Sequence, residues 1–485
     1  MSTATQSIPA FVPSSQPIPA AAFEVLSYLG VVAIATLCFL LGWLQPNGAA
    51  VLTVLLLFSL IVLAWKNFDQ GRHPCFLFLC VLMFFQGGRL LAYCFGAEAD
   101  PMRIRFMVYR AFNLSRDEAG ILLLCLALSA ICIYAPCRWK YRRVPPPDDL
   151  QATRFLPYLY LLFYAALPIQ LFKNYRYFEY IQEHGGYVSL FLNHSGLASS
   201  VPVFVRAVSI ISFPAFVAIF VIERRKKFLY LTTALYFVTS SLVLLWGSRA
   251  AIFGLILALW YVARIKSTKK ARLVLLAVMV AVLILGAEVI QNIREDADSA
   301  SGYSFTPFEF LVLNSASLEV TAVAVKYRQI FAPHVGSYLW HELQDAFVAN
   351  DTSNYFRGKA LAFDVSVFLN PARFSQGHGT GGSYIGEAYV IGGLAGVMVI
   401  SLLVGSGLHL LHHFSGTALS LFVVAMILPD IAFMPRGGLL DWLSVFARNA
   451  ISILLLALGW RLYRLVDLHP ANPLSMQNPE PGLGR

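Results

Sequence analysis

Long apolar segments recur along this chain, and they restrict its fold more than any other feature does. A helix that crosses the hydrocarbon core of a bilayer needs about 20 mainly apolar residues. Because lipid offers no hydrogen bonds to an open backbone, such segments indicate an all-α polytopic membrane protein. About twelve spans are predicted, near residues 24–44, 49–65, 74–95, 118–135, 155–172, 203–222, 228–246, 249–264, 273–290, 384–408, 418–434 and 440–460. The seventh and eighth are joined so tightly that we expect a helical hairpin.

The composition supports a membrane protein and argues against a nucleic-acid partner. Hydrophobic residues make up 58% of the chain and charged residues only 13%, whereas soluble domains carry about 25% charged residues. The formal net charge is +10, but nucleic-acid binders gather their basic residues on one face or stripe. Here the basic residues form short clusters between apolar segments, so we expect no nucleic-acid partner.

Those basic clusters predict the orientation of the chain. Short cytoplasmic loops carry an excess of Lys and Arg. If the N-terminus is placed in the cytoplasm, alternate loops receive the clusters at 66–72, 138–154, 224–227 and 264–272, whereas the short loops 45–48 and 247–248 on the other side are nearly uncharged. We therefore predict that both termini are cytoplasmic.

The same scan divides the chain into a body and two tails. Residues 1–22 contain no charge and are rich in Pro and Ser, and residues 466–485 are rich in Pro, Asn and Gly. We interpret both as disordered cytoplasmic tails around a single transmembrane domain, residues 23–465. The longest predicted loop, about 291–383, lies on the outer face before the third-last span. Its many aromatic residues favour an ordered structure.

Cysteine and histidine patterns predict no metal site. The seven cysteines all precede residue 138, lie in or beside apolar segments and form no CxxC pair. We expect them to pack as small apolar residues. His409, His412 and His413 have a spacing that could bind a metal, but no carboxylate is near them in sequence. We interpret them as an interfacial cluster and expect no cofactor.

Several arginines fall near the outer ends of predicted spans, namely Arg89, Arg206, Arg249 and Arg436. One interpretation is that such side chains simply extend to the membrane interface. The other is that the planar guanidinium fork binds phosphate oxygens, as in a pyrophosphate at the membrane surface. The tight Gly- or Pro-containing turns around Arg249 and Arg436 favour the second interpretation.

A glycine-rich segment, residues 377–387, leads directly into the tenth predicted span. Glycines such as Gly381 and Gly382 let a backbone approach a ligand closely, and successive N–H groups can form an anion-binding nest. The segment also carries His378 and Glu387 to the predicted depth of the arginines. Two alternatives stay open: Glu387 in the first helical turn could interact only with the helix dipole, and His378 could be solvated.

Three motifs together resemble a known family. The order is WGSR at 246–249, GHGTGGSYIGEAYVIGGLAG at 377–396 and PRGGLLDW at 435–442. Over about residues 170–450 the chain resembles the O-antigen and oligosaccharide repeat-unit polymerases, the Wzy family. The resemblance implies a GT-C-like membrane glycosyltransferase of the bacterial inner membrane. Its substrate would be an undecaprenyl-pyrophosphate-linked oligosaccharide on the periplasmic face. A chain-length regulator and a flippase of the same pathway are possible partners.

The resemblance also assigns roles. The glycan would move from its pyrophosphate carrier to a hydroxyl of the next repeat unit, without a metal and with inversion. Arg249 and Arg436 would stabilise the leaving pyrophosphate, and Glu387 or His378 would accept the hydroxyl proton. The matched motif positions carry Arg249, Glu387 and Arg436. Substrate-binding roles for Arg89 and Arg206, and the role of His378, rest on predicted depth alone.

Two other functions fit part of this pattern. An O-antigen ligase would also use outer-face arginines and a long loop, but the GGSYIGEAY stretch favours the polymerase. A transporter of polysaccharide or lipid-linked glycan would need no chemistry, but such folds usually show repeated halves and a site at the membrane midplane. The sequence shows no such repeat.

Overall fold

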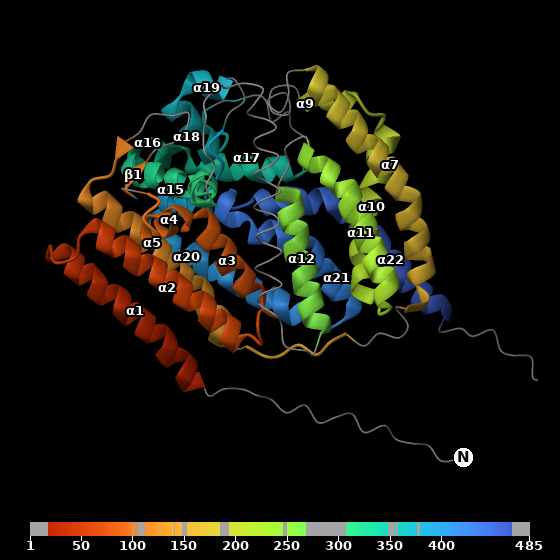
Figure 1. Cartoon of the computed structure of the whole chain (residues 1–485), viewed down its shortest axis with the longest axis horizontal. Helices are drawn as coiled ribbons and strands as arrows, with labels where there is room; N and C mark the ends of the chain where they lie inside the picture. Colours follow the sequence, from red (N-terminus) through yellow and green to blue (C-terminus); the bar gives the residue numbers. More distant parts are fainter. Residues whose placement is uncertain are drawn as a thin grey trace, which may run out of the picture.

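The computed structural model is built almost entirely from helices (Figure 1). It describes residues 18–98, 100, 102–104, 112–139, 141–147, 153–184, 194–245, 250–267, 307–347, 355, 357–375 and 379–467. Within them the one sheet is an antiparallel pair, β1 (Arg103–Ile104) and β2 (Phe112–Asn113). Arg249, His378 and the predicted span 273–290 lie outside the described residues.

The first helices form one side of the molecule (Figure 1). They are α1 (Ile18–Leu40), α2 (Pro46–Asn67), α3 (Pro74–Phe85), α4 (Gly88–Cys94) and α5 (Arg116–Trp139). Proline occupies the first helical position of α2 and α3, where its missing N–H costs no hydrogen bond. α5 packs against α1 and α2, and it makes its largest contact with α20 (Tyr384–Phe414).

A second group of helices stands on the other side (Figure 1). It comprises α7 (Leu156–Glu183), α9 (His194–Ser199), α10 (Val203–Ile222), α11 (Lys226–Leu245), α12 (Ala250–Lys266), α21 (Ala418–Ala432) and α22 (Asp441–Asp467). The expected hairpin of α11 and α12 is not packed along its length: α11 packs on α7, and α12 packs on α21. Gly254 of α12 allows the close packing on α21, because a Cβ at this position would lie 2.9 Å from Cβ of Pro429.

The described part of the predicted outer loop is mainly helical. Its elements are α14 (Pro307–Asn314), α15 (Ala316–Lys326), α16 (Arg328–Phe331), η2 (Ala332–His334), α17 (Val335–Phe347), α18 (Leu361–Leu369) and α19 (Pro371–Ser375). Small and β-branched residues let α15 bury almost its whole length against α20 and α5. α17 lies across the gap between the two helix groups (Figure 1) and packs on α22. This loop therefore forms part of the packed body.

The prediction of a polytopic helical protein is confirmed, while the number of spans is only partly tested. Among the described residues, seven helices are long and apolar enough to cross a membrane, and a bent pair formed by α3 and α4 would make eight. Helices α11, α12 and α22 lie where further spans were predicted. The full twelve and the GT-C-like fold stay predictions.

Two of these spans are broken. α3 and α4 meet at an angle of 67°. α20 is interrupted at Gly392 and Gly393, of which Gly393 has φ +61°. Ser129 bonds both Tyr384 and Ser401 of α20, although 17 helical residues would separate these two by about 25 Å along a straight axis. The break therefore folds the start of α20 back beside its later part.

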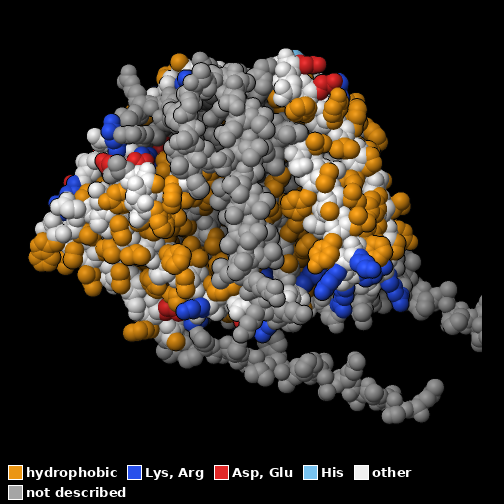
Figure 2. Space-filling view, viewed as in Figure 1, with side chains coloured by type: hydrophobic (Ala, Val, Ile, Leu, Met, Phe, Trp, Pro, Cys, Tyr) orange, Lys and Arg blue, Asp and Glu red, His pale blue; other side chains and the backbone are white. Residues whose placement is uncertain are grey.

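Charge is distributed unevenly over the surface (Figure 2). Lys and Arg gather at the lower edge of the view, below the hydrophobic belt of the α10 and α11 side, and acidic side chains appear mainly toward the top. The orientation of the chain stays a prediction, under which this basic edge would be the cytoplasmic one.

Candidate functional site: a carboxylate turn beside the glycine-rich segment

The glycine-rich segment and the PRGG turn are in direct contact, although they are more than fifty residues apart in sequence. The backbone N–H of Gly382 donates to the carbonyl of Arg436 at 3.0 Å. A Cβ at Gly382 would lie 2.8 Å from the carbonyl carbon of Gly437, and Gly381 has φ +77°. Position 382 therefore requires glycine for the close approach, and position 381 favours it for its backbone conformation.

A buried amide network fixes the start of α20 on this turn. Ser383 caps α20 by accepting from the N–H of Gly386 at 3.2 Å. Gln86, at the bend between α3 and α4, donates through Nε2 to Ser383 and to the carbonyl of Pro435, both at 2.8 Å. Thr321 of α15 contacts Ser383 at 2.7 Å and donates to Gln86. The broken span, the outer loop and both motifs are thus held together.

Three carboxylates converge on the turn that follows η3 (Met434–Arg436). Three consecutive backbone N–H groups each donate to a different side chain: Gly438 to Asp441 at 2.6 Å, Leu439 to Glu387 at 2.6 Å and Leu440 to Glu342 at 3.1 Å. We call these six residues the carboxylate turn. A Cβ on Gly438 would lie 2.5 Å from Oε1 of Glu342. Only glycine leaves room for the three carboxylates.

Burial and like charge together determine the protonation of the carboxylate turn. Glu342 and Glu387 are buried and hydrogen-bonded to each other. Burial, together with the neighbouring charge of Asp441, raises the pKa of Glu342 to about 8. The two glutamates therefore hold one proton between them at neutral pH, as expected when two carboxylates share one site. A carboxylate paired with a protonated neighbour is suited to accept a proton from a substrate.

Arg436 brings a positive charge to the edge of the same turn. Its side chain is exposed, donates to Oδ1 of Asn314 at 3.2 Å and lies over the ring of Phe85, with 5.1 Å from Cζ to the ring centroid. Four predicted residues thus lie at one turn: Glu387 and Arg436 flank it, Gly382 contacts it, and Gly381 lies beside Arg436. Arg89 and Arg206 lie in other environments, and Arg249 and His378 fall outside the described residues.

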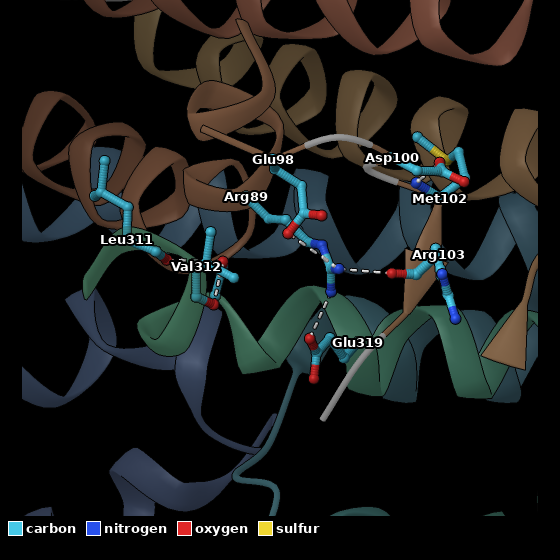
Figure 3. A network of polar contacts seen from close by, with 9 residues as sticks. Arg89, Glu98, Asp100, Met102, Arg103, Leu311, Val312 and Glu319 are labelled. Atoms are coloured by element: carbon cyan, nitrogen blue, oxygen red, sulfur yellow. Dashed lines mark hydrogen bonds and ion pairs between the residues drawn. The ribbon is translucent and has the colours of Figure 1, made fainter. Parts of the chain in front are cut away.

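Arg89 occupies a different environment (Figure 3). It is 1% exposed and forms ion pairs with Glu319 at 2.8 Å and Glu98 at 3.3 Å, and it also donates to the carbonyl of Arg103 at 2.6 Å. Burial raises the pKa of Glu319 to about 8, opposed by Arg89. The guanidinium thus compensates the carboxylates on both sides of it. We call Arg89, Glu98 and Glu319 the Arg89 network.

Arg206 lies in the first turn of α10, near Tyr177 of α7. Its Nε–H is buried and donates to no hydrogen-bond partner among the described residues. The substrate-binding roles predicted for Arg206 and Arg89 stay predictions. Those for Arg249 and His378 concern residues outside the described parts.

Sequence reasoning missed two members of the carboxylate turn. Asp441 lies in the PRGGLLDW motif, so its position next to Arg436 was a usable signal. No signal in the sequence marked Glu342. It is one of several polar residues in α17, and only its contact with the turn distinguishes it from the others. The same holds for Glu98 and Glu319, whose pairing with Arg89 joins three separate segments.

Comparison with known families identifies the chain at this point. Residues 25–464 match the family of the O-antigen polysaccharide polymerase Wzy. The chain belongs to this family. The resemblance seen in the sequence is confirmed, and it extends to nearly the whole chain, including the first four predicted spans. The family polymerises O-antigen repeat units, a glycosyltransferase-type reaction on lipid-linked oligosaccharides, and its members are multi-pass membrane proteins. Comparison with curated proteins and with solved structures returned no significant match.

Proposed function

We propose that this protein polymerises undecaprenyl-pyrophosphate-linked repeat units on the periplasmic face of the bacterial inner membrane, with the carboxylate turn as its catalytic centre. The growing glycan moves to a hydroxyl of the next lipid-linked unit. The observation that supports this most is the convergence of Glu387, Glu342 and Asp441 on Gly438, beside the exposed Arg436. Gathering three carboxylates on one turn is unfavourable for folding, and such clusters are typical of functional sites.

The reaction needs a proton acceptor and a stabiliser of negative charge. The acceptor oxygen attacks the anomeric carbon, and the bond from that carbon to the carrier pyrophosphate breaks with its electrons. Glu387 accepts the hydroxyl proton. Arg436, with Arg249 as a second candidate, stabilises the charge that develops on the pyrophosphate. Direct displacement inverts the anomeric centre. Because arginines supply the positive charge, this scheme requires no metal.

Glu342 has a supporting role in this scheme. Its proton, shared with Glu387, lowers the charge of the pair, while the Leu439 N–H holds Glu387 in place. The glycine-rich segment completes the site, because Gly382 is hydrogen-bonded to the Arg436 carbonyl and Gly381 exposes its backbone next to Arg436. We assign the remaining residues Arg89, Arg206 and His378 no step in the chemistry.

The experiment is deletion of the gene in a strain that makes long surface glycan, followed by gel analysis of its lipopolysaccharide. A polymerase deletion leaves core bearing single repeat units, and wild-type complementation restores the ladder. Bare core with polymer left on the lipid carrier would instead indicate a ligase, and bare core without polymer a flippase. Unchanged long ladders would refute the proposal.

A reconstituted assay tests the same reaction directly. Purified protein in liposomes, supplied with lipid-linked repeat units and no nucleotide sugar, should release carrier pyrophosphate as the glycan lengthens. Product that keeps the anomeric configuration of the donor would contradict direct displacement.

A further inference from the structure

The break inside α20 separates a short first helix from the rest of the span. Gly392 and Gly393 are not helical, and Gly393 combines φ 61° with ψ −146°. Residues other than glycine rarely adopt this backbone conformation. We call the helical residues before the break, 384–391, the half-helix. It carries Glu387, which accepts from the Leu439 N–H in the carboxylate turn, so the position of the half-helix decides where the proposed base lies.

The break also ends the hydrogen bonding within the half-helix. The last four carbonyls of a helix have no partner inside it. The Tyr389 carbonyl accepts instead from Nε of Arg328 at 3.2 Å. The neighbouring Ala388 carbonyl faces Gly396, from the later part of α20, where a Cβ would lie 2.3 Å from the carbonyl oxygen. Arg328 therefore supplies a hydrogen bond that the break removes, and position 396 requires glycine for the fold-back.

Arg328 lies in the corner that the break forms. Its Cζ lies over the ring of Tyr389, 5.7 Å from the centroid, and a Cβ on Gly393 would lie 4.0 Å from that same Cζ. A guanidinium over an aromatic face is attracted to it. A cation at the C-terminus of a helix also interacts favourably with the helix dipole. The hydrogen bond, the ring contact and the dipole thus all favour one position of Arg328 against the half-helix.

The segment formed by α15 and α16 runs along the half-helix in the same direction. At its start, Thr321 contacts the N-cap Ser383 at 2.7 Å. Further along, a Cβ at Gly386 would lie 3.5 Å from Cβ of Ala324. Arg328 then contacts the last turn. Seven residues of helix, from 321 to 328, extend about 10 Å, which is close to the length of the half-helix. The outer loop therefore holds the half-helix at both ends.

We propose that Arg328 is a positioning residue for glycosyl transfer, which fixes the half-helix so that Glu387 meets the acceptor hydroxyl in the geometry that proton transfer needs. Arg328 acts through the backbone and ring of Tyr389 and takes no part in the chemistry itself. Without it, the last turn of the half-helix loses its charged donor and Glu387 is held less exactly. A displacement of about 1 Å in an active site can cost about 10²-fold in rate. The inference rests on the proposed function, in which Glu387 is the base.

The first test is steady-state kinetics of Arg328→Ala in the reconstituted assay, with rates taken per folded molecule. We expect kcat to fall by about 10–10²-fold, with little change in KM for the lipid-linked repeat unit. Arg328→Lys keeps a charged donor and should recover part of kcat. Lys326→Ala is the matched control, because it removes a cation from the same segment, but Lys326 pairs with Glu118 of α5. An unchanged kcat, or a rise in KM alone as for a substrate-binding residue, would overturn the proposal.

A double-mutant cycle separates positioning from a general effect on the fold. Residues that act through one group are far from additive in their effects on rate. Arg328→Ala should therefore slow the wild-type protein but cause no further loss in the Glu387→Gln variant. Equal fold-losses in both backgrounds would refute the positioning role and leave Glu387 as the base. A normal rate for Glu387→Gln alone would instead remove the proposed base, and this inference with it.

Discussion

The Arg89 network and the carboxylate turn are both charged, contain buried carboxylates and lie close to the bend between α3 and α4, yet they organise charge in opposite ways. In the first, one arginine lies between two carboxylates. In the second, three carboxylates meet on one turn and are held by backbone N–H groups. The first arrangement cancels its own charge, while the second concentrates charge of one sign.

This difference predicts which residues act mainly on the stability of the fold and which act mainly on the reaction. Breaking a buried ion pair leaves an uncompensated charge, so such pairs affect folding strongly. Gathering like charges is unfavourable for folding and perturbs pKa values, and such groups cluster at functional sites. We therefore expect substitutions in the Arg89 network to act mainly on stability, and those in the carboxylate turn to act mainly on activity.

The largest expected effect is that of Arg89→Ala. Removing the guanidinium leaves Glu98 and Glu319 facing each other without a cation, at a cost of about 3–5 kcal/mol. Thermal unfolding of the detergent-solubilised protein measures this loss. Arg103→Ala is the control, because only the backbone carbonyl of Arg103 contacts Arg89 and its own side chain is exposed. Equal stability of both variants would remove the structural role from Arg89.

Glu387→Gln tests the expectation that the carboxylate turn acts mainly on activity. The amide oxygen can still accept from Leu439, so the fold should persist, while loss of the base should reduce the polymerisation rate by about 10²–10⁴-fold. Initial rates in the reconstituted assay measure this change, with Glu179→Gln in a surface ion pair as control. A normal rate for Glu387→Gln would exclude Glu387 as the base.

Arg436→Ala should reduce the rate somewhat less. Removing one group that stabilises developing negative charge typically costs about 10²–10³-fold in rate. Arg436→Lys should recover part of this, since the charge remains but the planar fork is lost. Arg373→Ala, an exposed arginine of α19, serves as the control. If Arg436→Ala lost as much stability as Arg89→Ala but kept a normal rate per folded molecule, Arg436 would have a structural role and no role in the reaction.

The smallest effect concerns pH. Glu342 has a pKa of about 8 in the fold against its ordinary value of 4.5. The folded protein therefore binds more protons than the unfolded chain between these values, and stability should fall as the pH rises through that window. Glu342→Gln keeps a neutral donor beside Glu387 at every pH and should flatten this fall. Melting temperatures between about pH 5 and about pH 9 compare the two. Parallel curves would show that Glu342 does not hold the proton.

The sequence predicted one half of the candidate site. The glycine-rich segment and the PRGG motif were informative because both combine an unusual backbone requirement with a charged residue, Glu387 in one and Arg436 in the other. Their direct contact through Gly382 supports reading them as one unit. Arg89 was predicted to bind substrate from its depth along a predicted span. That depth does not reveal that Glu319 lies opposite it.

The sequence by itself determined the membrane-embedded helical body. The length and apolarity of a segment are local properties, and they decide whether a helix is stable in lipid. Only the tertiary structure decided which charges are paired and which are gathered. Glu319 meets Arg89, and Glu342 meets Glu387, because α15 and α17 of the outer loop pack into the body. Such contacts depend on how distant helices pack, and no periodicity or motif along the chain encodes their partners.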